Sequence, residues 1–393
     1  MSSIFTVHID VFYNLPYFRE AIKAIQDQTY QNLEIIISNN GADQEITDFI
    51  SETKTSDKRV KVITYEENIF SYDDPLNYIY VLCGDALKIA EGDFYFYQSY
   101  DDLLSLDYVE RMVRLFKENT ECISAAGLPI PVDIHGKIEE TSALGNDLAE
   151  GIANRTTNLR PRYMPGHEMA LDCLDSDNFD PKGGKMFSSP GTIFSFRKDA
   201  LIKYGGFHRS AEVSQLYGIV PFGITGFDEE AFFYWRLHEG QLNKELSQRG
   251  YTGRKEFDSM LNDFEIRERW GVFGEDVAQY VVSRMSTALD VAAANCTTFC
   301  LFTFSFKGAV RSFFDSCWNL DYWKALPKLI WYQKMVLVLS LLSTFQWLIQ
   351  PFINVLNGLF PSKAPGSGTI QKIKKYYDTE NNSTLSIPYK SSK

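Results

Sequence analysis

Residues 92–104 read GDFYFYQSYDDLL, and the expected organisation of the chain follows from this stretch. It opens with a Gly-Asp turn, continues as an aromatic strand at 94–97, and stops on the adjacent acids Asp101 and Asp102. A helix is expected to follow at about 106–118. An apolar strand that ends in acids just before a helix is where an open α/β sheet places its ligand chemistry.

The two adjacent carboxylates require a counter-charge, because both cannot stay ionised in an apolar site without one. A divalent cation such as Mg²⁺ or Mn²⁺ suits carboxylate and phosphate oxygens, so Asp101 and Asp102 are candidate metal ligands. A structural alternative remains open, in which the two acids cap the helix that begins near Ser105.

Strands and helices alternate through the first part of the chain. Apolar runs at 4–12, 33–38 and 60–65 predict three further strands, and helical periodicity at 17–26, 44–53 and 75–91 separates them. This alternation predicts an α/β fold with a doubly wound, mostly parallel sheet. The loops at 13–14, 39–41 and 99–102 would then lie together at the edge formed by the carboxyl ends of the strands, which predicts a ligand site there.

The composition excludes several classes of partner and site. The chain has 393 residues and a formal net charge of −12, so it has no large basic field for binding nucleic-acid backbones. Its six cysteines include no C-x-x-C pair, and its five histidines show no metal-ligand spacing. No dinucleotide fingerprint, P-loop or G-x-S-x-G elbow is present. We therefore expect no nucleic-acid partner.

Four segments, in the same order along the chain, resemble the family-2 glycosyltransferases. They are VHIDVFYNLPYFREAIKAIQDQTYQNLEIIISNNGADQE at 7–45, GDFYFYQSYDDLL at 92–104, SSPGTIFSFRKDALIKYGGF at 188–207 and GFDEEAFFYWRLHEG at 226–240. The resemblance is specific because all four segments occur in the order found in the family. No single segment would be specific by itself. The resemblance implies a GT-A fold and an enzyme that moves a sugar from a nucleotide-sugar donor with inversion at the anomeric carbon.

The resemblance also implies how a divalent cation, Mn²⁺ or Mg²⁺, is held. Asp101 aligns with the second acid of the family's D-x-D motif, which implies direct metal contact, and Asp102 is an adjacent acid that many members carry. Ser99 stands where the first acid of the motif falls. This departure leaves less negative charge for the metal and the ribose, so the donor diphosphate would provide most of the contacts that hold the cation.

Two further positions are implied to contact the nucleobase. Tyr13 matches a position that borders the base. Asn39 stands where the family usually has an Asp that accepts a hydrogen bond from uracil. An amide can also accept, so UDP remains the expected carrier. The alternative for Asn39 is turn chemistry with Gly41.

The catalytic base is implied to come from the acids of the FDEE block. Such a base takes the proton of the acceptor hydroxyl. The family's acidic pair aligns best with Glu230, and Glu229 and Asp228 are the neighbouring candidates. Alternatively, Asp228 is the N-cap of a helix expected at 229–237.

The chain is expected to divide into four parts. These are a GT-A catalytic domain at 1–240 (donor half 1–128, acceptor half 129–240), a helical extension at 241–328, membrane-associated helices at 329–361 and a flexible tail at 362–393. The uncharged run at 335–362 is long enough to span a bilayer. However, Pro351 interrupts it, polar residues recur along one helical face, and lysines flank both ends, so a helix pair lying in the membrane plane is favoured. A helical hairpin packed on the protein, or on a second copy of the chain, is the alternative.

The function expected from these features is inverting glycosyl transfer at the cytoplasmic face of a membrane, to a hydroxyl of a glycan or lipid-linked glycan. Two alternatives remain open. One is a soluble transferase with a protein or free saccharide acceptor. The other is a catalytically silent GT-A domain that only binds nucleotide or glycan, an idea supported by Ser99 and Asn39 standing where the family has acids.

Overall fold

The computed structural model describes residues 3–137, 162–175, 194–208, 211–251, 265–302 and 306–316, with 258, 260, 261, 323 and 326 as single positions. The helices expected at 329–361 and the tail expected at 362–393 lie outside these residues. The division into domains therefore stays a prediction.

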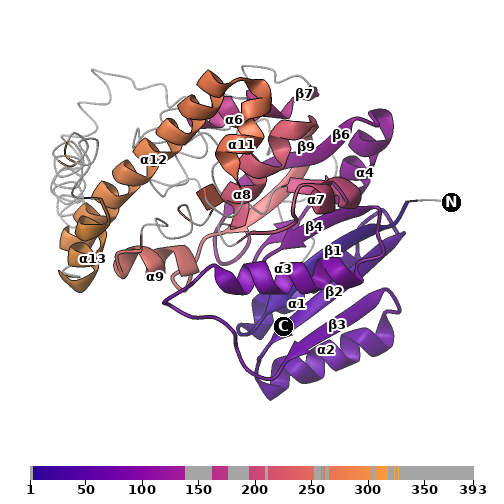
Figure 1. The fold of residues 1–393 in the computed structure, drawn as a ribbon. Coiled ribbons are helices and arrows are strands. Elements are labelled where there is room, and N and C mark those ends of the chain that lie inside the picture. The colour runs from indigo at the N-terminus through magenta and orange to yellow at the C-terminus, as the bar shows by residue number, and fades with distance from the viewer. Residues whose placement is uncertain are drawn as a thin grey trace, which may run out of the picture.

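A nine-stranded sheet forms the centre of the molecule (Figure 1). Its strands are β1 (Phe5–Val11), β2 (Leu33–Asn40), β3 (Val60–Tyr65), β4 (Phe94–Gln98), β5 (Leu103–Leu104), β6 (Cys122–Val132), β7 (Tyr163–Pro165), β8 (Phe194–Arg197) and β9 (Ile224–Arg236). The strand order is β3-β2-β1-β4-β8-β6-β9-β5, and β7 pairs with β9 beside this path.

Most strands run in one direction, as the sequence predicts. β1 pairs in parallel with β2 and β4, and β2 pairs in parallel with β3. β8 is antiparallel to both of its neighbours, β4 and β6, so β6 again runs with β4. β9 is parallel to β6. The prediction of an α/β fold with a mostly parallel sheet followed by a helical region is confirmed.

Helices cover both faces of the first four strands. They are α1 (Leu15–Gln26), α2 (Gln44–Ser56) and α3 (Asn77–Ile89), and α4 (Tyr108–Glu118) follows β5. Phe18 of α1 meets Phe49 of α2 edge to face, so these two helices share one face of the sheet. The chain then reverses its winding direction after β3, and the right-handed crossover places α3 on the opposite face, in front of the strands in Figure 1.

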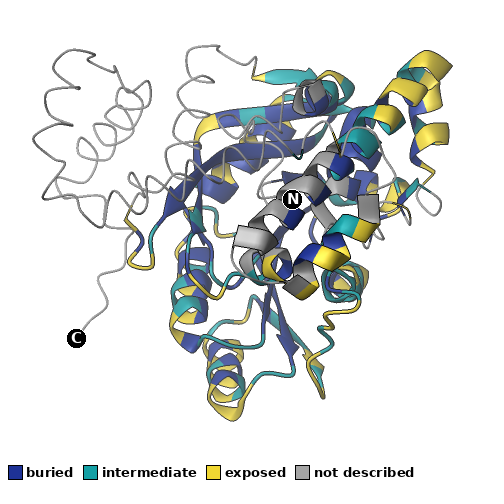
Figure 2. Ribbon diagram, turned by 90° about the vertical axis from the view of Figure 1, so that its left-hand side faces the viewer, coloured by how far each residue is buried: buried dark blue, intermediate teal, exposed yellow. Residues whose placement is uncertain are grey.

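The strands at the centre of the sheet are buried along their whole length (Figure 2). One face of β1 carries polar side chains that are fully paired inside the core. His8 Nε2 lies 2.9 Å from Ser38 Oγ, and His8 Nδ1 lies 2.9 Å from the hydroxyl of Tyr95. Burial lowers the pKa of His8 to about 3, so this ring is neutral in the folded protein at physiological pH.

The second half of the chain is rich in helices. They are α6 (Gly166–Asp175), α7 (Lys198–Lys203), α8 (Ala211–Gly218), η3 (Val220–Phe222), α9 (Leu242–Gln248), α11 (Ile266–Trp270), η4 (Gly271–Phe273), α12 (Glu275–Phe302) and α13 (Phe306–Ser316). The indole of Trp270 is fully buried and donates to the carbonyl of Tyr217, which fixes α11 to α8. None of the helices in the described part of the chain is both long and apolar enough to cross a bilayer.

The prediction of a helix at 229–237 is wrong, because these residues belong to strand β9 and the turn that follows it. β9 pairs with β6, β5 and β7. Its run Phe232-Phe233-Tyr234-Trp235 consists of aromatic residues, which pack well on a pleated surface. A short continuous apolar run does not distinguish a buried strand from a helix, so only the pairing of β9 with its neighbours determines its structure.

Candidate functional site

The carboxyl ends of the parallel strands meet at one edge of the sheet, and a cavity of about 480 Å³ opens there. Tyr13 follows β1 on this edge, and Ser99 and Asp101 follow β4. All three were predicted as site residues, and all three line the cavity. The structure thus brings together the loops after β1 and β4, as expected for an open α/β sheet.

Half of the residues that line the cavity are aromatic. They are Phe12, Tyr13, Phe70, Tyr72, Tyr78 and Tyr100. Tyr13 contacts Tyr100 edge to face, with ring centroids 5.1 Å apart. Phe70 meets Tyr72 and Tyr78 in the same manner, at 4.9 and 5.6 Å. Aromatic faces of this kind stack with nucleobases of any sequence, because every base has a π-face.

The acid that faces the cavity is Asp101, whose side chain is 15% exposed. Its Oδ2 lies 2.9 Å from Nε2 of His238, which follows β9. His238 itself is buried, and its ring contacts Tyr17 of α1 with centroids 5.3 Å apart. Histidine spacing in the sequence gave no indication of this contact, because the partner is a single acid 137 positions away.

The neighbouring acid, Asp102, turns toward β9 and does not line the cavity. Its Oδ1 accepts a hydrogen bond of 3.0 Å from the backbone N–H of Arg236, and the residue is only 4% exposed. Burial, and then the charge of Asp101, raise the pKa of Asp102 well above its usual range. The geometry therefore supports a ligand role at this edge for Asp101 and a structural one for Asp102, whose metal contact stays a prediction.

Asn39 also lies outside the cavity lining, although the resemblance implied contact with a base. Its Oδ1 accepts a hydrogen bond from the N–H of Ala42, and its Nδ2 donates to Thr47 Oγ1. The residue is 3% exposed. These contacts are those of a turn residue that ties the end of β2 to α2, which was the alternative for this position.

A segment from the second half of the chain closes the cavity. Gly240, Leu242 and Glu245, which follow β9, belong to its lining. The carbonyl of Gly240 accepts a hydrogen bond of 3.0 Å from the hydroxyl of Tyr13. Sequence reasoning did not assign these residues to the site.

Glu245 is fixed by the loop between β3 and α3. Its Oε2 accepts a hydrogen bond of 2.7 Å from the hydroxyl of Tyr72. The guanidinium of Arg249 lies over the ring of Tyr72, 3.6 Å from its centroid. The loop after β3 is therefore joined to α9 through two residues of the cavity lining, Tyr72 and Glu245.

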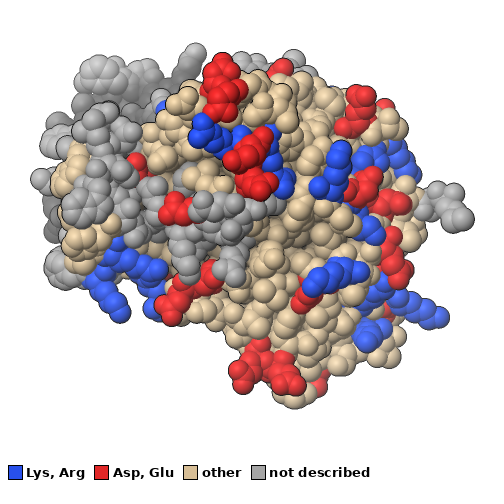
Figure 3. Space-filling model, viewed as in Figure 1, with Lys and Arg blue, Asp and Glu red and all other residues tan. Residues whose placement is uncertain are grey.

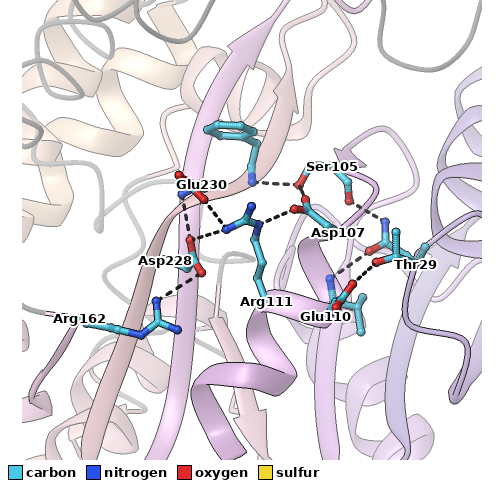
Figure 4. Close-up of polar contacts among 11 residues, drawn as sticks. Thr29, Ser105, Asp107, Glu110, Arg111, Arg162, Asp228 and Glu230 are labelled. Atoms are coloured by element: carbon cyan, nitrogen blue, oxygen red, sulfur yellow. Dashed lines mark hydrogen bonds and ion pairs between the residues drawn. The ribbon is translucent and has the colours of Figure 1, made fainter. Parts of the chain in front are cut away.

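The three acids predicted to include the catalytic base lie elsewhere, on β9. Asp228 is 5% exposed and lies 3.3 Å from Arg111 Nη1, and Glu230 lies 2.7 Å from the same nitrogen (Figure 4). Arg162 approaches the other oxygen of Asp228 at 3.7 Å. Glu229 is exposed. Asp228 does not cap a helix, since its Oδ1 accepts from the N–H of Glu230 within the strand.

The three acids are separated from the cavity along β9. The end of this strand reaches the cavity, because Arg236 and His238 contact Asp102 and Asp101, whereas residues 228–230 lie earlier in the strand. None of the three acids belongs to the cavity lining. Their role as base stays a prediction.

The charge of the cavity is negative. Its described lining contains the carboxylates of Asp101 and Glu245 and no Lys or Arg. On the face shown in Figure 3, basic side chains lie among acidic ones and do not gather into one large basic field. The guanidinium of Arg249 lies next to this lining, over the ring of Tyr72.

The N-terminal part of the chain matches a known family model. Residues 6–73 match the model described as glycosyl transferase family 2. An uncharacterised glycosyltransferase of Haemophilus influenzae is 25% identical over 206 residues, which is 48% of this chain and 61% of that relative. The chain thus spans about three fifths of that relative's length.

Solved glycosyltransferase structures show weaker similarity. S. aureus TarS 1–349 in complex with UDP-GlcNAc is 12% identical with a TM-score of 0.46, and the match covers 79% of this chain and 89% of that one. The mannosyltransferase PcManGT from Pyrobaculum calidifontis, in complex with GDP-Man and Mn²⁺, is 11% identical with a TM-score of 0.43, covering 83% of this chain and 87% of that one.

Proposed function

We propose that this chain, whose residues 6–73 match the glycosyl transferase family 2 model, transfers a sugar from a nucleotide-sugar donor to an acceptor hydroxyl with inversion. The observation that carries this proposal is the cavity at the carboxyl edge of β1 and β4. It combines aromatic rings with two acids, Asp101 and Glu245, and its described lining contains no basic side chain.

A nucleoside diphosphate fits this combination of groups when a divalent cation accompanies it. The aromatic wall would take the base and ribose, and the diphosphate would lie toward Asp101. Asp101 would hold the cation. The Nε2 atom of His238, 2.9 Å from Asp101 Oδ2, is placed to be a second protein ligand. Among the described residues no cluster of three or more His, Cys, Asp or Glu side chains could hold a metal. In this proposal the donor diphosphate would complete the coordination.

The protein's own groups would orient the donor and exclude water. Tyr13 and Tyr100 contact each other in the wall, and the Tyr72–Glu245 hydrogen bond joins two further lining residues. When bound, the cation neutralises the negative charge that develops on the departing diphosphate. Holding donor and acceptor in line supplies a further large part of the rate enhancement.

The acceptor that we propose is a hydroxyl of a glycan or lipid-linked glycan. Its proton would go to one of the acids of β9, with Glu230 the first candidate. Residues 329–361 would bring the enzyme to the cytoplasmic face of a membrane, where such an acceptor is presented. UDP is the carrier that we propose, with Mn²⁺ or Mg²⁺ as the cation.

A panel of nucleoside diphosphates tests the donor site. The thermal stability of the full chain would be measured with UDP, dTDP, GDP and CDP, each with and without Mn²⁺. A ligand at 100 times its dissociation constant stabilises the folded state by about 2.7 kcal/mol. We expect a Mn²⁺-dependent rise in Tm with at least one diphosphate, and no rise with any of them would refute the proposal.

A silent binding domain is the second candidate, and the position of the predicted base acids favours it. Asp228 and Glu230 are both paired with Arg111, outside the cavity. The two candidates differ in turnover. A silent domain would bind the nucleotide sugar but would leave it unconsumed with every glycan acceptor and with water.

A further inference from the structure

The helix α13 has a buried face and an exposed face. Ala309 and Ser312 are buried, and Ser312 Oγ lies 2.9 Å from Thr297 Oγ1 of α12. This contact holds α13 against α12, on the side of the molecule that faces the viewer in Figure 2. The residues of α13 that the structure describes as exposed are Lys307, Val310, Arg311 and Phe314.

These four residues, which we call the α13 stripe, lie on one face of the helix. They occupy positions i, i+3, i+4 and i+7, which share a face because an α-helix has 3.6 residues per turn. Val310 is 56% exposed and Phe314 is 60% exposed, so two large apolar side chains of the stripe are in contact with water. Lys307 and Arg311 add two positive charges. Asp315, the acid in the sequence of α13, is not a member of the stripe.

An exposed tryptophan extends the apolar part of the α13 stripe. Trp323 is 48% exposed, and its ring meets Phe313 edge to face with centroids 5.9 Å apart. Phe313 meets Phe314 in the same manner at 5.3 Å. Helices that lie in a membrane interface combine Lys or Arg with Trp, Phe and Leu, because the cations attract anionic headgroups and the apolar groups enter the boundary of the acyl region. The core of a protein interface, by contrast, is depleted of lysine.

The α13 stripe lies beside the helix that carries part of the cavity lining. The guanidinium of Arg311 is 5.9 Å from the centre of the Tyr251 ring. Tyr251 follows α9, and its backbone N–H donates to the carbonyl of Leu246 in that helix at 3.0 Å. Leu242 and Glu245 of α9 line the cavity. A surface bound through α13 would therefore lie on the α9 side of the cavity.

We propose that the α13 stripe, together with Trp323, docks the protein on an anionic lipid surface. Val310 and Phe314 would enter the boundary between headgroups and acyl chains. Lys307 and Arg311 would extend to the headgroups, since their long side chains can bury the stem and keep the charge in water. The docking adds a second membrane contact to the one proposed for residues 329–361. It rests on the proposed function for one point, the lipid-linked acceptor, which this orientation would present beside the cavity.

Vesicle binding of the full chain tests the docking surface. Co-sedimentation is measured with vesicles of phosphatidylcholine alone and with vesicles that contain about one third phosphatidylglycerol, at low and at high ionic strength. The variant Val310→Ser/Phe314→Ser removes the apolar groups, and Lys307→Gln/Arg311→Gln removes the charges. All four side chains are exposed, so these substitutions leave the buried face of α13 intact.

Matched controls carry the same kinds of change elsewhere on the surface. Ile202→Ser/Val272→Ser replaces two apolar residues that are 55% and 72% exposed. Lys23→Gln/Lys88→Gln removes two charges from side chains that are 51% and 75% exposed.

We expect the wild type and both controls to bind the anionic vesicles, and high salt to weaken this binding. Each α13 variant should partition at least about tenfold more weakly than the wild type, with an unchanged Tm. Residues 329–361 are the same in every variant, so the difference between variants reports the contribution of α13 alone.

Several results would overturn the inference. If the wild type does not bind the anionic vesicles, or if both α13 variants bind them equally well, α13 is not a docking surface. A wild-type dimer that dissociates in Val310→Ser/Phe314→Ser would assign the stripe to a second copy of the chain. A fall in Tm with unchanged vesicle binding would assign it to another segment of the same chain. The vesicle assay contains no nucleotide and the thermal-shift panel contains no lipid, so failure of the docking and failure of the proposed function are distinguishable.

Discussion

Nε2 of His238 lies 2.9 Å from Oδ2 of Asp101, although the two residues are 137 positions apart. β5 and β9 pair in antiparallel fashion, and this pairing brings the turn after β9 to the loop after β4. The acid of the cavity is therefore supported by a residue from the other half of the sheet. Any cation held by Asp101 would lie within reach of this histidine.

Asp101→Asn should abolish the effect of Mn²⁺ on nucleotide binding. The amide keeps the shape of the side chain but removes the negative charge that a hard cation requires. We expect the dissociation constant of UDP to become independent of Mn²⁺, and calorimetry with and without the metal measures this. Asp48→Asn, on the exposed part of α2, is the matched control. If UDP binding by Asp101→Asn still depends on Mn²⁺, Asp101 is not a ligand of the metal.

Glu230→Gln tests the identity of the base. If Glu230 takes the acceptor proton, kcat should fall about 10²-fold or more while the affinity for UDP stays unchanged. Loss of the ion pair with Arg111 should change the stability by less than about 1 kcal/mol, because the Glu230 side chain is 52% exposed. Steady-state kinetics and Tm are measured together.

Glu229→Gln provides the comparison, since it removes an adjacent exposed acid from the same strand. If turnover stays near native in Glu230→Gln and collapses in Glu229→Gln, the catalytic base is Glu229 and not Glu230. Native turnover in both variants, given an active wild type, would show that the base is not one of these two glutamates.

Tyr72→Phe should accelerate the release of nucleotide. The substitution removes the hydrogen bond to Glu245 and keeps the ring beneath Arg249. A hydrogen bond of this kind is worth about 1 kcal/mol, so the dissociation rate should rise about fivefold. Stopped-flow displacement of a fluorescent nucleotide measures the rate. Tyr80→Phe is the control, because Tyr80 is similarly exposed and lies outside the cavity lining. Equal rates in the two variants would show that this contact does not close the cavity.

His8 should make the protein sensitive to mild acid. Burial lowers its pKa in the folded state to about 3, so between about pH 6.5 and 3 only the unfolded chain takes up its proton. Its contribution to stability is complete above pH 6.5 and is lost as the pH falls toward 3. The loss is on the order of 5 kcal/mol at its limit.

Denaturant unfolding at several pH values measures this effect against His8→Gln. Asp10 works in the opposite direction, because burial raises its pKa to about 6 and its protonation stabilises the fold as the pH falls. The difference between wild type and His8→Gln isolates the histidine, since Asp10 is present in both. A pH-independent difference would contradict the prediction.

The sequence predicts the first four strands, because their apolar runs alternate with helical periodicity and end at turn residues. It also predicts that the loops carrying Tyr13, Ser99 and Asp101 share one edge, since parallel strands place their carboxyl ends together. The structure confirms the sheet and the shared edge. These features depend on local pattern and on a general rule of sheet topology.

Other features depend on which distant segments pair. A helix was predicted at 229–237 because Asp228 is a suitable N-cap residue, but these residues pair with β5 and β6 and form part of strand β9. The contacts of Asp101 with His238, and of Arg111 with Glu230, result from that pairing. No spacing within a single segment encodes them.

Asn39 shows the same division at the scale of one side chain. The sequence predicted an amide at the end of β2, where a base would bind. Only the tertiary structure decided that this amide is bonded to Ala42 and Thr47 and lies outside the cavity lining. The physical reason is that local pattern specifies where a strand ends, whereas the direction of a polar side chain depends on the donors and acceptors that the rest of the chain brings to it.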